Sequence, residues 1–588
     1  MKNLHELGML VPTLIAAGAL VWGCASTDDV VATGDPDADG GLGGAAGGGG
    51  SAAGGSGNSG GSDAGLDVNL PDAPVGETCE AAAKASSTYG CEYFALQVDT
   101  INEPTGGYGL PGACYAVFVA NRGLGPVKIE VDRAGQQFTN TDFIRIPKGQ
   151  GKGIVYQPYD AANGLPPNEV AILFLSEGNP PKNMNCPVPT ALKADTAVHG
   201  SGLGNAFHIK TSAPVSAYQI FPYGGGAVAA TSASLLLPTS AWDGNYVAIN
   251  AYKQSTVHPK YAMPSLDIVA QEDNTTVKIN PVAAIEPGVN VGATAAGQIV
   301  EYKLKRGEYV QFTQGAELTG SAIQADKPVG VFGGATCINV PADKEACDTA
   351  QQQLLPVKQL GHEYVAVRYK ARRLGFDPVD ESVPWRIVGA VDGTTLTYSP
   401  AAPTGAPTTL KQGEVAEFWT KAAFTVKSQD KDHPFYVGAY MTGGNDFLGE
   451  GDPEWVNVVP VGQYLDSYVF FTDPTYPETS LVVVRQKDAG GQFQDVELEC
   501  MGTLGDWKPL GDYEYTHATL VTGAFQDQGN CSNGRQSMKS KAPFTATVWG
   551  WGSVTFGPSD VYTAYVSYAY PAGMGTKLIN TVEIPVVK

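Results

Sequence analysis

A closing segment recurs four times along the chain, and this recurrence constrains the fold more than any other feature. The copies read FHIKTSAPVSAYQIFPYGG, SAIQADKPVGVFGGATC, FTVKSQDKDHPFYVGAYMTGG and SMKSKAPFTATVWGWGS. Their prolines, which are 114, 106 and 109 residues apart, are Pro214, Pro328, Pro434 and Pro543. A period of about 110 residues suits a β-sandwich of about seven strands. We therefore expect tandem β-sandwich-like repeat units.

An opening motif recurs in three of the copies with a fixed internal spacing. In each of them a tyrosine follows a proline by eight residues: Pro238 and Tyr246, Pro356 and Tyr364, Pro460 and Tyr468. Several ordered motifs at nearly constant offsets are unlike a chance recurrence of turn-forming residues between strands. The opening and closing motifs therefore belong to one repeat.

Two turn dipeptides occupy matching places in the second and third copies. Asp273-Asn274 and Asp392-Gly393 each stand between apolar runs that alternate with polar residues. Asn and Gly tolerate a positive φ, so we expect a β-hairpin at each place. A further strand is expected over residues 304–312, with its counterpart over 410–418.

Short strand-forming segments dominate the rest of the chain. Residues 115–121, 127–133 and 169–176 are rich in β-branched and aromatic side chains, and Gly, Pro or Asn bounds them. The chain has 40 prolines and 73 glycines, which punctuate strands at intervals of about ten residues. Only residues 77–86 suggest a short helix. The predicted fold class is all-β.

The N-terminus has the form of an export signal. Its apolar run, from Leu7 to Trp22, is short for a membrane-spanning helix. The end of the run, Val21 to Cys24, resembles the lipobox of bacterial lipoproteins, in which a diacylglyceryl group is added to the cysteine. We expect a signal peptide over residues 1–23 and lipidation of Cys24. The alternative is an ordinary signal peptide with an incidental cysteine.

A tether follows the expected anchor. Residues 24–77 are rich in Gly and Ser and have almost no side chains to bury, so we expect a disordered linker. Such a coil has an end-to-end distance of roughly 40 Å. Ala25 after the cysteine resembles the default that sends lipoproteins to the outer membrane of the bacterial cell envelope. We divide the remaining chain into β units over 78–230, 231–342, 343–450 and 451–588.

Charge and cysteine content narrow the class of protein. The net charge of −22 leaves no basic stripe for phosphates, so we expect no nucleic-acid partner.

Eight cysteines remain once Cys24 is set aside, and an even number in an exported chain suggests four disulfides. Scattered buried thiols are the alternative. The eight are Cys79, Cys91, Cys114, Cys186, Cys337, Cys347, Cys500 and Cys531.

The repeat resembles a known family. The segments FHIKTSAPVSAYQIF, SASLLLPTSAWDGNYVAI and ADKPVGVFGGATCINVPADKEACDTAQQQLLPVKQLGHEYVAV are similar to the IgGFc-binding protein N-terminal domain family. The similarity is strongest over residues 200–450. It implies an extracellular binding or adhesion region. We do not carry over antibody Fc binding, because the leader is of bacterial type.

The resemblance also implies a disulfide pattern. In the family a cysteine pair closes a short loop between two units, and here Cys337 and Cys347 are ten residues apart. Cys500 and Cys531 would then join within the last unit. The remaining four, which would pair near the first unit with undetermined connectivity, are Cys79, Cys91, Cys114 and Cys186.

The chain carries few residues in catalytic patterns. None of its seven histidines forms HExxH, and no P-loop or CxxC motif occurs, so we predict no enzyme activity and no cofactor. His208 and His433 flank closing strands, and we expect them at the surface or at sheet edges. Trp549 and Trp551 lie on one strand face. We expect them in the core, with an exposed binding platform as the alternative.

One loop, residues 444–455, gathers four carboxylates on a glycine-rich segment. Oxygen ligands of this kind suit Ca²⁺, but a solvated acidic connector is the simpler interpretation, because the other copies lack the cluster. The four weak metal candidates are Asp446, Glu450, Asp452 and Glu454.

These patterns predict a surface-anchored bacterial lipoprotein that binds or adheres to an extracellular protein or glycan. A cell-surface carbohydrate-active enzyme is an alternative, since it needs two carboxylates in one cleft and Asp446 and Asp452 are its candidates. A purely structural envelope or stalk protein is a further alternative.

Overall fold

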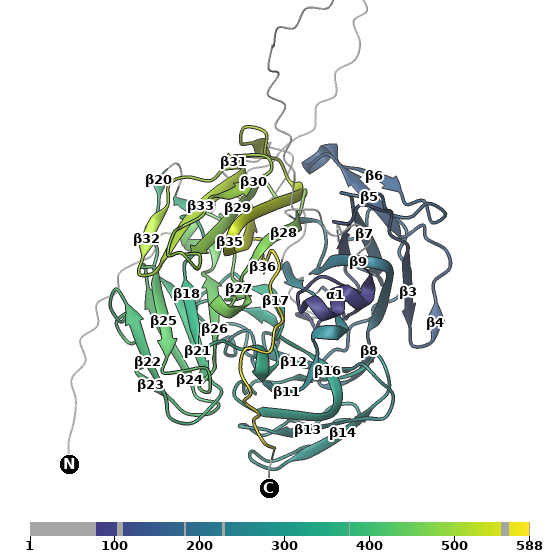
Figure 1. Ribbon diagram of the computed structural model, residues 1–588. Coiled ribbons are helices and arrows are strands. Elements are labelled where there is room, and N and C mark those ends of the chain that lie inside the picture. The colour runs from purple at the N-terminus through teal and green to yellow at the C-terminus, as the bar shows by residue number, and fades with distance from the viewer. Residues whose placement is uncertain are drawn as a thin grey trace, which may run out of the picture. The chain divides into compact units, whose positions relative to one another are not determined.

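The computed structural model describes residues 78–102, 110–180, 184–225, 230–374, 377–553 and 564–586. The described residues all belong to one compact unit. The expected signal peptide, the lipidation site Cys24 and the linker 24–77 lie outside the described residues. Strands account for nearly all regular structure in the described part, so the predicted all-β fold class is confirmed (Figure 1).

The strands form four groups, which we call modules 1 to 4 (Figure 1). Module 1 contains α1 (Cys79–Ala85), β1 (Gly90–Ala95), β2 (Tyr115–Ala120), β3 (Ile129–Arg133), β4 (Gln136–Gln137), β5 (Ile144–Lys148), η1 (Gly151–Gly153), β6 (Val155–Pro158), β7 (Val170–Ser176), β9 (Phe207–Phe221) and β10 (Ser232–Leu235). Module 2 contains β8 (Gly202–Asn205), η3 (Thr239–Ala241), β11 (Asp243–Val247), β12 (Pro264–Ala270), β13 (Thr275–Asn280), β14 (Val300–Leu304), β15 (Glu308–Thr313), β16 (Ala322–Ile338) and β17 (Asp348–Gln353).

Modules 3 and 4 repeat this plan. Module 3 contains η4 (Val357–Gln359), β18 (Glu363–Ala366), β19 (Arg373–Leu374), β20 (Asp377–Pro378), β21 (Val383–Gly389), β22 (Thr394–Ser399), β23 (Thr409–Leu410), β24 (Val415–Thr420), β25 (Phe424–Ser428), β26 (Phe435–Met441), η5 (Gly444–Phe447) and β27 (Glu454–Asn457). Module 4 contains η6 (Val461–Gln463), β28 (Leu465–Thr472), β29 (Glu478–Gln486), β30 (Val496–Leu498), β31 (Gly502–Thr503), β32 (Lys508–Leu510), β33 (Tyr513–Thr522), β34 (Gln526–Asp527), β35 (Gly534–Trp551) and β36 (Ser567–Pro571).

The recurring closing segment forms the strand that joins the two halves of each module. In module 2 the first half of β16 pairs with β11 and β13, and its second half pairs with β12 and β17. β9 and β35 do the same in modules 1 and 4. In module 3 two strands, β25 and β26, share this role in two separate sheets. Each module is therefore sandwich-like.

The closing prolines lie where the strand passes from one half to the other. Pro434 lies just before the first residue of β26. Pro214, Pro328 and Pro543 lie inside β9, β16 and β35. The pairing with the opening strand shifts register close to each of these three prolines. A residue without an N–H fits such a shift, because no ladder donor is lost there.

The Asp-Asn and Asp-Gly turns form as predicted, but the hairpins do not. Asn274 and Gly393 adopt positive φ values of 58° and 76°. However, β12 pairs with β15 and β16, whereas β13 pairs with β14 and β16, so the turn carries the chain between halves of the module. Residues 304–312 likewise span β14, a turn and β15. A local turn sequence does not specify which neighbour a strand pairs with.

The four modules meet through their innermost strands, β10, β17, β27 and β36, which contact one another in a closed ring. Gln352 of β17 lies at this meeting point. Its side-chain nitrogen is 3.0 Å from the carbonyl oxygens of Ala233 and Trp455 and 3.1 Å from that of Ala569. One amide thus contacts all three other innermost strands.

The module boundaries defined by strand pairing do not coincide with the boundaries of the sequence repeat. β10, at the start of the 231–342 segment, pairs with β9 and completes module 1. β8, which precedes β9 in the chain, pairs with β15 in module 2. A cyclic repeat allows such an offset, and these exchanges tie neighbouring modules together.

Candidate binding site at the joint of modules 2 and 3

All eight described cysteines form disulfides. The pairs are Cys79–Cys91, Cys114–Cys186, Cys337–Cys347 and Cys500–Cys531. Four disulfides, including the two pairings implied by the family resemblance, are therefore present, and the connectivity near module 1 is resolved. The alternative of buried free thiols is wrong for these eight residues.

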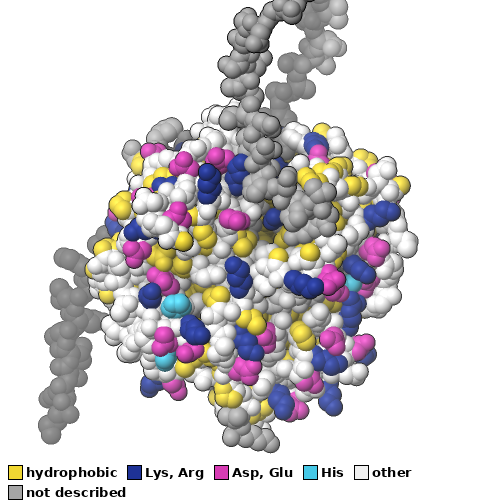
Figure 2. Space-filling model, in the orientation of Figure 1, with side chains coloured by type: hydrophobic (Ala, Val, Ile, Leu, Met, Phe, Trp, Pro, Cys, Tyr) yellow, Lys and Arg dark blue, Asp and Glu magenta, His cyan; other side chains and the backbone are white. Residues whose placement is uncertain are grey.

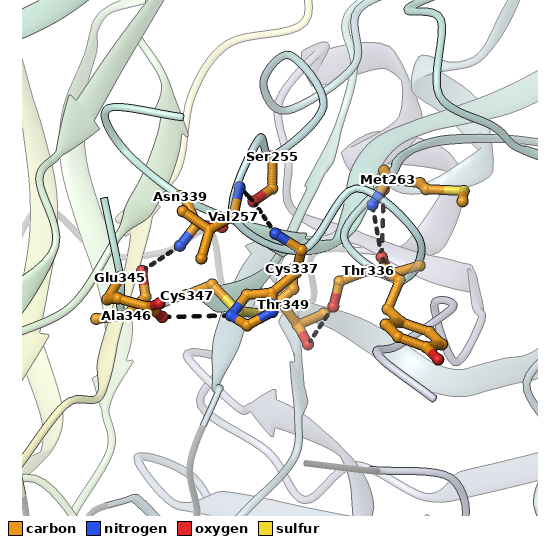
Figure 3. Close-up of a disulfide and its surroundings, with 12 residues drawn as sticks. Ser255, Val257, Met263, Thr336, Cys337, Asn339, Glu345, Ala346, Cys347 and Thr349 are labelled. Atoms are coloured by element: carbon orange, nitrogen blue, oxygen red, sulfur yellow. Dashed lines mark hydrogen bonds and ion pairs between the residues drawn. A yellow bond between two sulfur atoms is a disulfide. The ribbon is translucent and has the colours of Figure 1, made fainter. Parts of the chain in front are cut away.

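The Cys337–Cys347 bond closes a loop between β16 and β17, which we call the disulfide loop (residues 337–347, Figure 3). Asn339 braces the loop from inside, since its amide donates to the carbonyl oxygens of Lys344 at 2.6 Å and Ala346 at 2.9 Å. From outside, the Thr256 N–H donates to the Ala342 carbonyl at 2.9 Å. The loop is thus fixed at its base and within its turn.

A second loop, residues 442–452 after β26, packs against the disulfide loop. The Gly443 N–H donates to the Val340 carbonyl oxygen at 2.9 Å. Any side chain at Gly443 would have its Cβ 3.2 Å from the Glu345 carbonyl oxygen, which is tighter than ordinary contact. The close approach therefore favours glycine here.

The side chain of Arg372 fixes the second loop through hydrogen bonds to its backbone. Its guanidinium is fully buried and pairs with the Glu381 carboxylate at 2.9 Å. It also donates to the carbonyl oxygens of Thr442 and Glu450, both at 3.0 Å, and lies 3.7 Å from the centre of the Phe447 ring. A buried charge with this many partners is compensated, so Arg372 fixes the loop rather than binding solvent ions.

A cavity of about 260 Å³ lies between the two loops. Aromatic rings of Trp419 and Phe447 line it, and its polar lining comes from both loops and from the two residues just before β21. The polar lining residues are Lys344, Glu345, Glu381, Ser382, Asn445 and Asp446. Aromatic surface beside amide, ammonium and carboxylate groups suits a ligand with both apolar faces and hydrogen-bonding groups.

The sequence did not single out Trp419, although one signal was present. Aligning EYVQFT (308–313) with EVAEFWT (414–420) from the shared glutamate places Trp419 opposite Thr313. Module 3 therefore departs from module 2 at the position that lines the cavity. This departure from the internal repeat is the sequence signal that distinguishes Trp419.

The four carboxylates of residues 444–455 do not converge. Asp446 is exposed at the cavity, and Glu450 accepts hydrogen bonds from the Arg373 N–H and the Trp551 indole. Asp452 accepts from the Gly444 N–H at 2.9 Å, and Glu454 accepts from Ser232 at 3.1 Å. Across the described residues, no group of three or more His, Cys, Asp or Glu is arranged to hold a metal ion.

Two of these carboxylates belong to an acidic cluster near the centre of the ring, together with Asp348. All three are buried, and burial raises the pKa of Asp348 and Glu454 well above their usual range and that of Asp452 to about 7. Repulsion from Asp452 and Glu454 further raises the pKa of Asp348. The expected solvated connector is therefore wrong for Asp452 and Glu454, because the chain turns inward there to enter β27. It is also wrong for Glu450, which is buried against Arg373 and Trp551.

Two other expectations concerned aromatic and histidine residues. Trp549 and Trp551 are both buried in β35, as predicted. His208 is not a surface residue: it is buried in β9 and contacts Asp132 at 2.7 Å and Glu92 at 2.9 Å. The hydrogen bond between His208 and Glu92 is the main reason why the pKa of Glu92 is lowered to about 2. Arg306, 3.0 Å from Glu92, links this network to module 2.

Comparison with known proteins places the chain in a family of binding proteins. A family model described as IgGFc binding protein matches residues 232–550, which is more than half of the chain. The chain therefore belongs to the IgGFc-binding protein family, as its motifs predicted. The matched region includes the cavity and both loops that form it.

A curated relative is the human IgGFc-binding protein, which is 25% identical over 297 residues. The match covers 49% of this chain and 5% of the human protein, so the chain corresponds to a small part of that relative. No solved structure matches the chain. In the part of the chain that is described, no helix is both long and apolar enough to cross a membrane.

Proposed function

We propose that this protein is a bacterial surface lipoprotein that binds an extracellular protein or glycan. The observation that carries the proposal is the cavity between the disulfide loop and residues 442–452. Both walls are held by a covalent bond or by buried hydrogen bonds, so little ordering entropy is lost when a ligand binds. Family membership supports a binding role for this region.

The lining favours recognition through an aromatic face and a polar rim. Trp419 and Phe447 offer ring surface, and Asn445 and Asp446 offer hydrogen-bonding groups beside it. Both a sugar ring and a protein loop can use this combination. The name of the human relative refers to IgG Fc, and from it we infer only that a protein partner is a reasonable first choice.

The alternative of a carbohydrate-active enzyme has little support from the two carboxylates suggested for it. Asp446 is exposed, whereas Asp452 is only 2% exposed and faces the ring centre. A glycosidase pair must flank one bond of the same bound substrate. We therefore propose a binding protein without enzyme activity and without a required cofactor, which a calcium titration followed by calorimetry would test.

The binding proposal is tested on protein and glycan arrays with the chain that starts after Cys24. We expect at least one ligand whose binding falls more than tenfold in Trp419→Ala. Trp507→Ala, which removes another half-buried tryptophan from module 4, is the matched control and keeps binding. If both variants bind a ligand equally, the cavity is not the binding site. If no ligand binds at all, a structural stalk becomes the better interpretation.

We infer the location from residues 1–77 alone. Lipid at Cys24 would anchor the chain to the outer membrane, and the Gly/Ser-rich linker would hold the modules away from it. Labelling cells with a radioactive fatty acid should mark the protein, and Cys24→Ser should abolish the label. An unlabelled native chain would exclude the lipid anchor without affecting the binding proposal.

A further inference from the structure

Beyond β36 the chain continues as an extended segment, residues 573–586, which we call the strap. In Figure 1 it is the yellow segment that runs from β36 towards the end marked C, and Figure 2 shows the same face with acidic and basic side chains interspersed. The strap is not part of any sheet, and an isolated bridge between Ser87 and Gly575 is its one ladder contact among the described residues. It nevertheless contacts all four modules.

Two side-chain amides hold the strap by its backbone. The Gln463 amide donates to the Lys577 carbonyl at 2.8 Å and accepts from the Lys577 N–H at 3.0 Å. Asn245 makes the same pair of bonds with Ile584, both at 2.8 Å. An amide that bonds both backbone groups of one residue recognises an extended peptide whatever its side chain is.

Asn580 provides the side-chain anchor between these two clamps. It is buried, and its amide nitrogen donates to the carbonyl oxygens of Val357 at 2.8 Å and Leu360 at 2.9 Å. Its own side-chain oxygen accepts from the Val582 N–H at 2.8 Å. An asparagine side chain has the length and the groups to make all three hydrogen bonds. Binding at this position therefore depends on the sequence of the strap.

The groove is built from the same place in successive modules. Gln463 belongs to η6, Val357 belongs to η4, and Asn245 lies in β11, the strand that follows η3. In module 1, Ser86 accepts from the Thr576 N–H at 2.7 Å ahead of β1. Each module thus contributes a binding position to the groove. The start of the strap, residues 573–576, is buried, and Asn580, Ile584 and Val586 are buried further along it.

The chain just before the strap is attached to the ring independently of the strap, although Met574, Ile584 and Val586 of the strap pack in the core. Ala572, just before it, is fixed separately by hydrogen bonds to Ala546 at 2.9 Å and from Tyr218 at 2.7 Å. The strap itself has no disulfide and exposes Lys577, Leu578 and Glu583. Its attachment therefore rests on hydrogen bonds and a few buried side chains, which a chemically identical segment can replace.

We propose that this groove is a peptide-binding site, occupied by the chain's own strap, and that the strap of a second copy binds there when the resident strap is released. Chains held close together on a surface would then be linked by strap exchange. The site is separate from the cavity at the joint of modules 2 and 3, so this inference does not depend on the proposed ligand of that cavity.

The test uses the full chain with Asn580→Ala and Ile584→Ser, which weakens the resident strap and leaves the groove intact. A fluorescent peptide of residues 573–586 should bind this variant at least tenfold more tightly than the unsubstituted chain, whose groove is occupied. Fluorescence anisotropy measures both affinities. Equal binding to the two chains would overturn the proposal.

Matched peptides test the mode of binding. Asn580→Ala in the peptide should weaken binding at least tenfold, because two buried hydrogen bonds are lost. Leu578→Ala should leave it unchanged, since that side chain is 66% exposed. Adding Gln463→Ala to the variant chain should also weaken binding. A peptide that binds equally well without Asn580 would show non-specific association and overturn the assignment.

Hydrogen exchange on the unsubstituted full chain provides a measurement that needs no variant. The strap amides of Gly575, Lys577, Ile579 and Ile584 should exchange together and faster than the amides of β36. This result is expected if the strap opens as a unit. Exchange of the strap only with global unfolding would contradict release and exchange.

Discussion

At the scale of single residues, four tyrosine hydroxyls perform one task in four modules. Each accepts from an N–H three residues earlier and donates to the carbonyl of the residue after a closing proline. The hydroxyl-to-carbonyl pairs are Tyr93 to Val215, Tyr246 to Val329, Tyr364 to Phe435 and Tyr468 to Phe544. The constant spacings in the sequence therefore reflect a constant hydrogen-bond geometry. Tyr93 is the equivalent tyrosine of module 1, which the proline-to-tyrosine spacing does not identify.

Tyr364→Phe tests this role. Removing the hydroxyl leaves the buried Gly361 N–H and Phe435 carbonyl without this partner, so we expect a loss of about 1–3 kcal/mol in unfolding free energy. Tyr302→Phe is the matched control, because the Tyr302 hydroxyl is buried without a partner. Urea unfolding followed by tryptophan fluorescence measures both. Equal effects of the two substitutions would contradict the assigned role.

A second prediction at this scale concerns His199. Hydrogen bonds to Asp195 at 2.9 Å and Asp99 at 3.2 Å raise its pKa to about 10. The folded protein therefore keeps this proton longer than the unfolded chain, whose histidine titrates near 6.5. The stabilisation is complete below about pH 6.5 and is lost as the pH rises towards 10.

Melting temperatures between pH 6.5 and pH 10 check this expectation. The native protein should lose stability over this window, and His199→Gln should reduce that loss. His433→Gln, at a half-buried histidine that contacts Asp430, serves as control and should follow the native profile. If His199→Gln leaves the slope unchanged, the ion pairs do not hold the proton as proposed.

At the scale of elements, the strand assignments and the pairing of strands differ in how well sequence determines them. The segments 115–121, 127–133 and 169–176 form β2, β3 and β7, and Thr78 caps the predicted short helix by accepting from the Ala81 N–H. Alternating apolar residues specify such elements locally. Pairing depends on which half of the module each face packs against, and turn residues such as Asn274 do not encode that choice.

The disulfide loop is the element whose loss should matter most for the cavity. Replacing Cys337 and Cys347 by alanine frees a loop of ten residues, and the chain-entropy model gives a loss of about 2–3 kcal/mol. We expect a lower melting temperature together with faster hydrogen exchange at Gly443, whose N–H bonds to the loop. The double alanine variant of Cys500 and Cys531 is the control and should leave exchange at Gly443 unchanged.

At the scale of the whole molecule, the ring of innermost strands buries carboxyl groups that no single module would bury. Asp348 of β17, Asp452 before β27 and Glu454 of β27 come together with Ser232 and Ser567. One oxygen of Asp348 and one of Glu454 have no hydrogen-bond partner. Because burial opposes ionisation, these carboxyls bind protons more strongly in the folded ring than in the unfolded chain.

This arrangement predicts greater stability at mildly acidic pH. The pKa of Asp452 is about 7 in the fold, and that of an unfolded aspartate is about 4, so stability declines as the pH rises between these values. Burial causes this rise in the pKa of Asp452, while the hydrogen bond from the Gly444 N–H and the charge of Arg372 oppose it. Asp452→Asn should reduce the decline between pH 4.5 and pH 6.5 by about 2 kcal/mol. Chemical unfolding at several pH values measures the slope, and an unchanged slope would refute the assignment.

The sequence by itself determined the all-β class, the family, the period of about 110 residues and the parity of the cysteines, because these follow from local pattern and from motifs at fixed spacing. The tertiary structure decided the rest. It brought Trp419 to the disulfide loop, Gln352 to the centre of the ring and Asn580 to a groove built from all four modules. Such contacts join residues from about 70 to more than 200 positions apart, and their energies depend on how modules pack rather than on any local pattern.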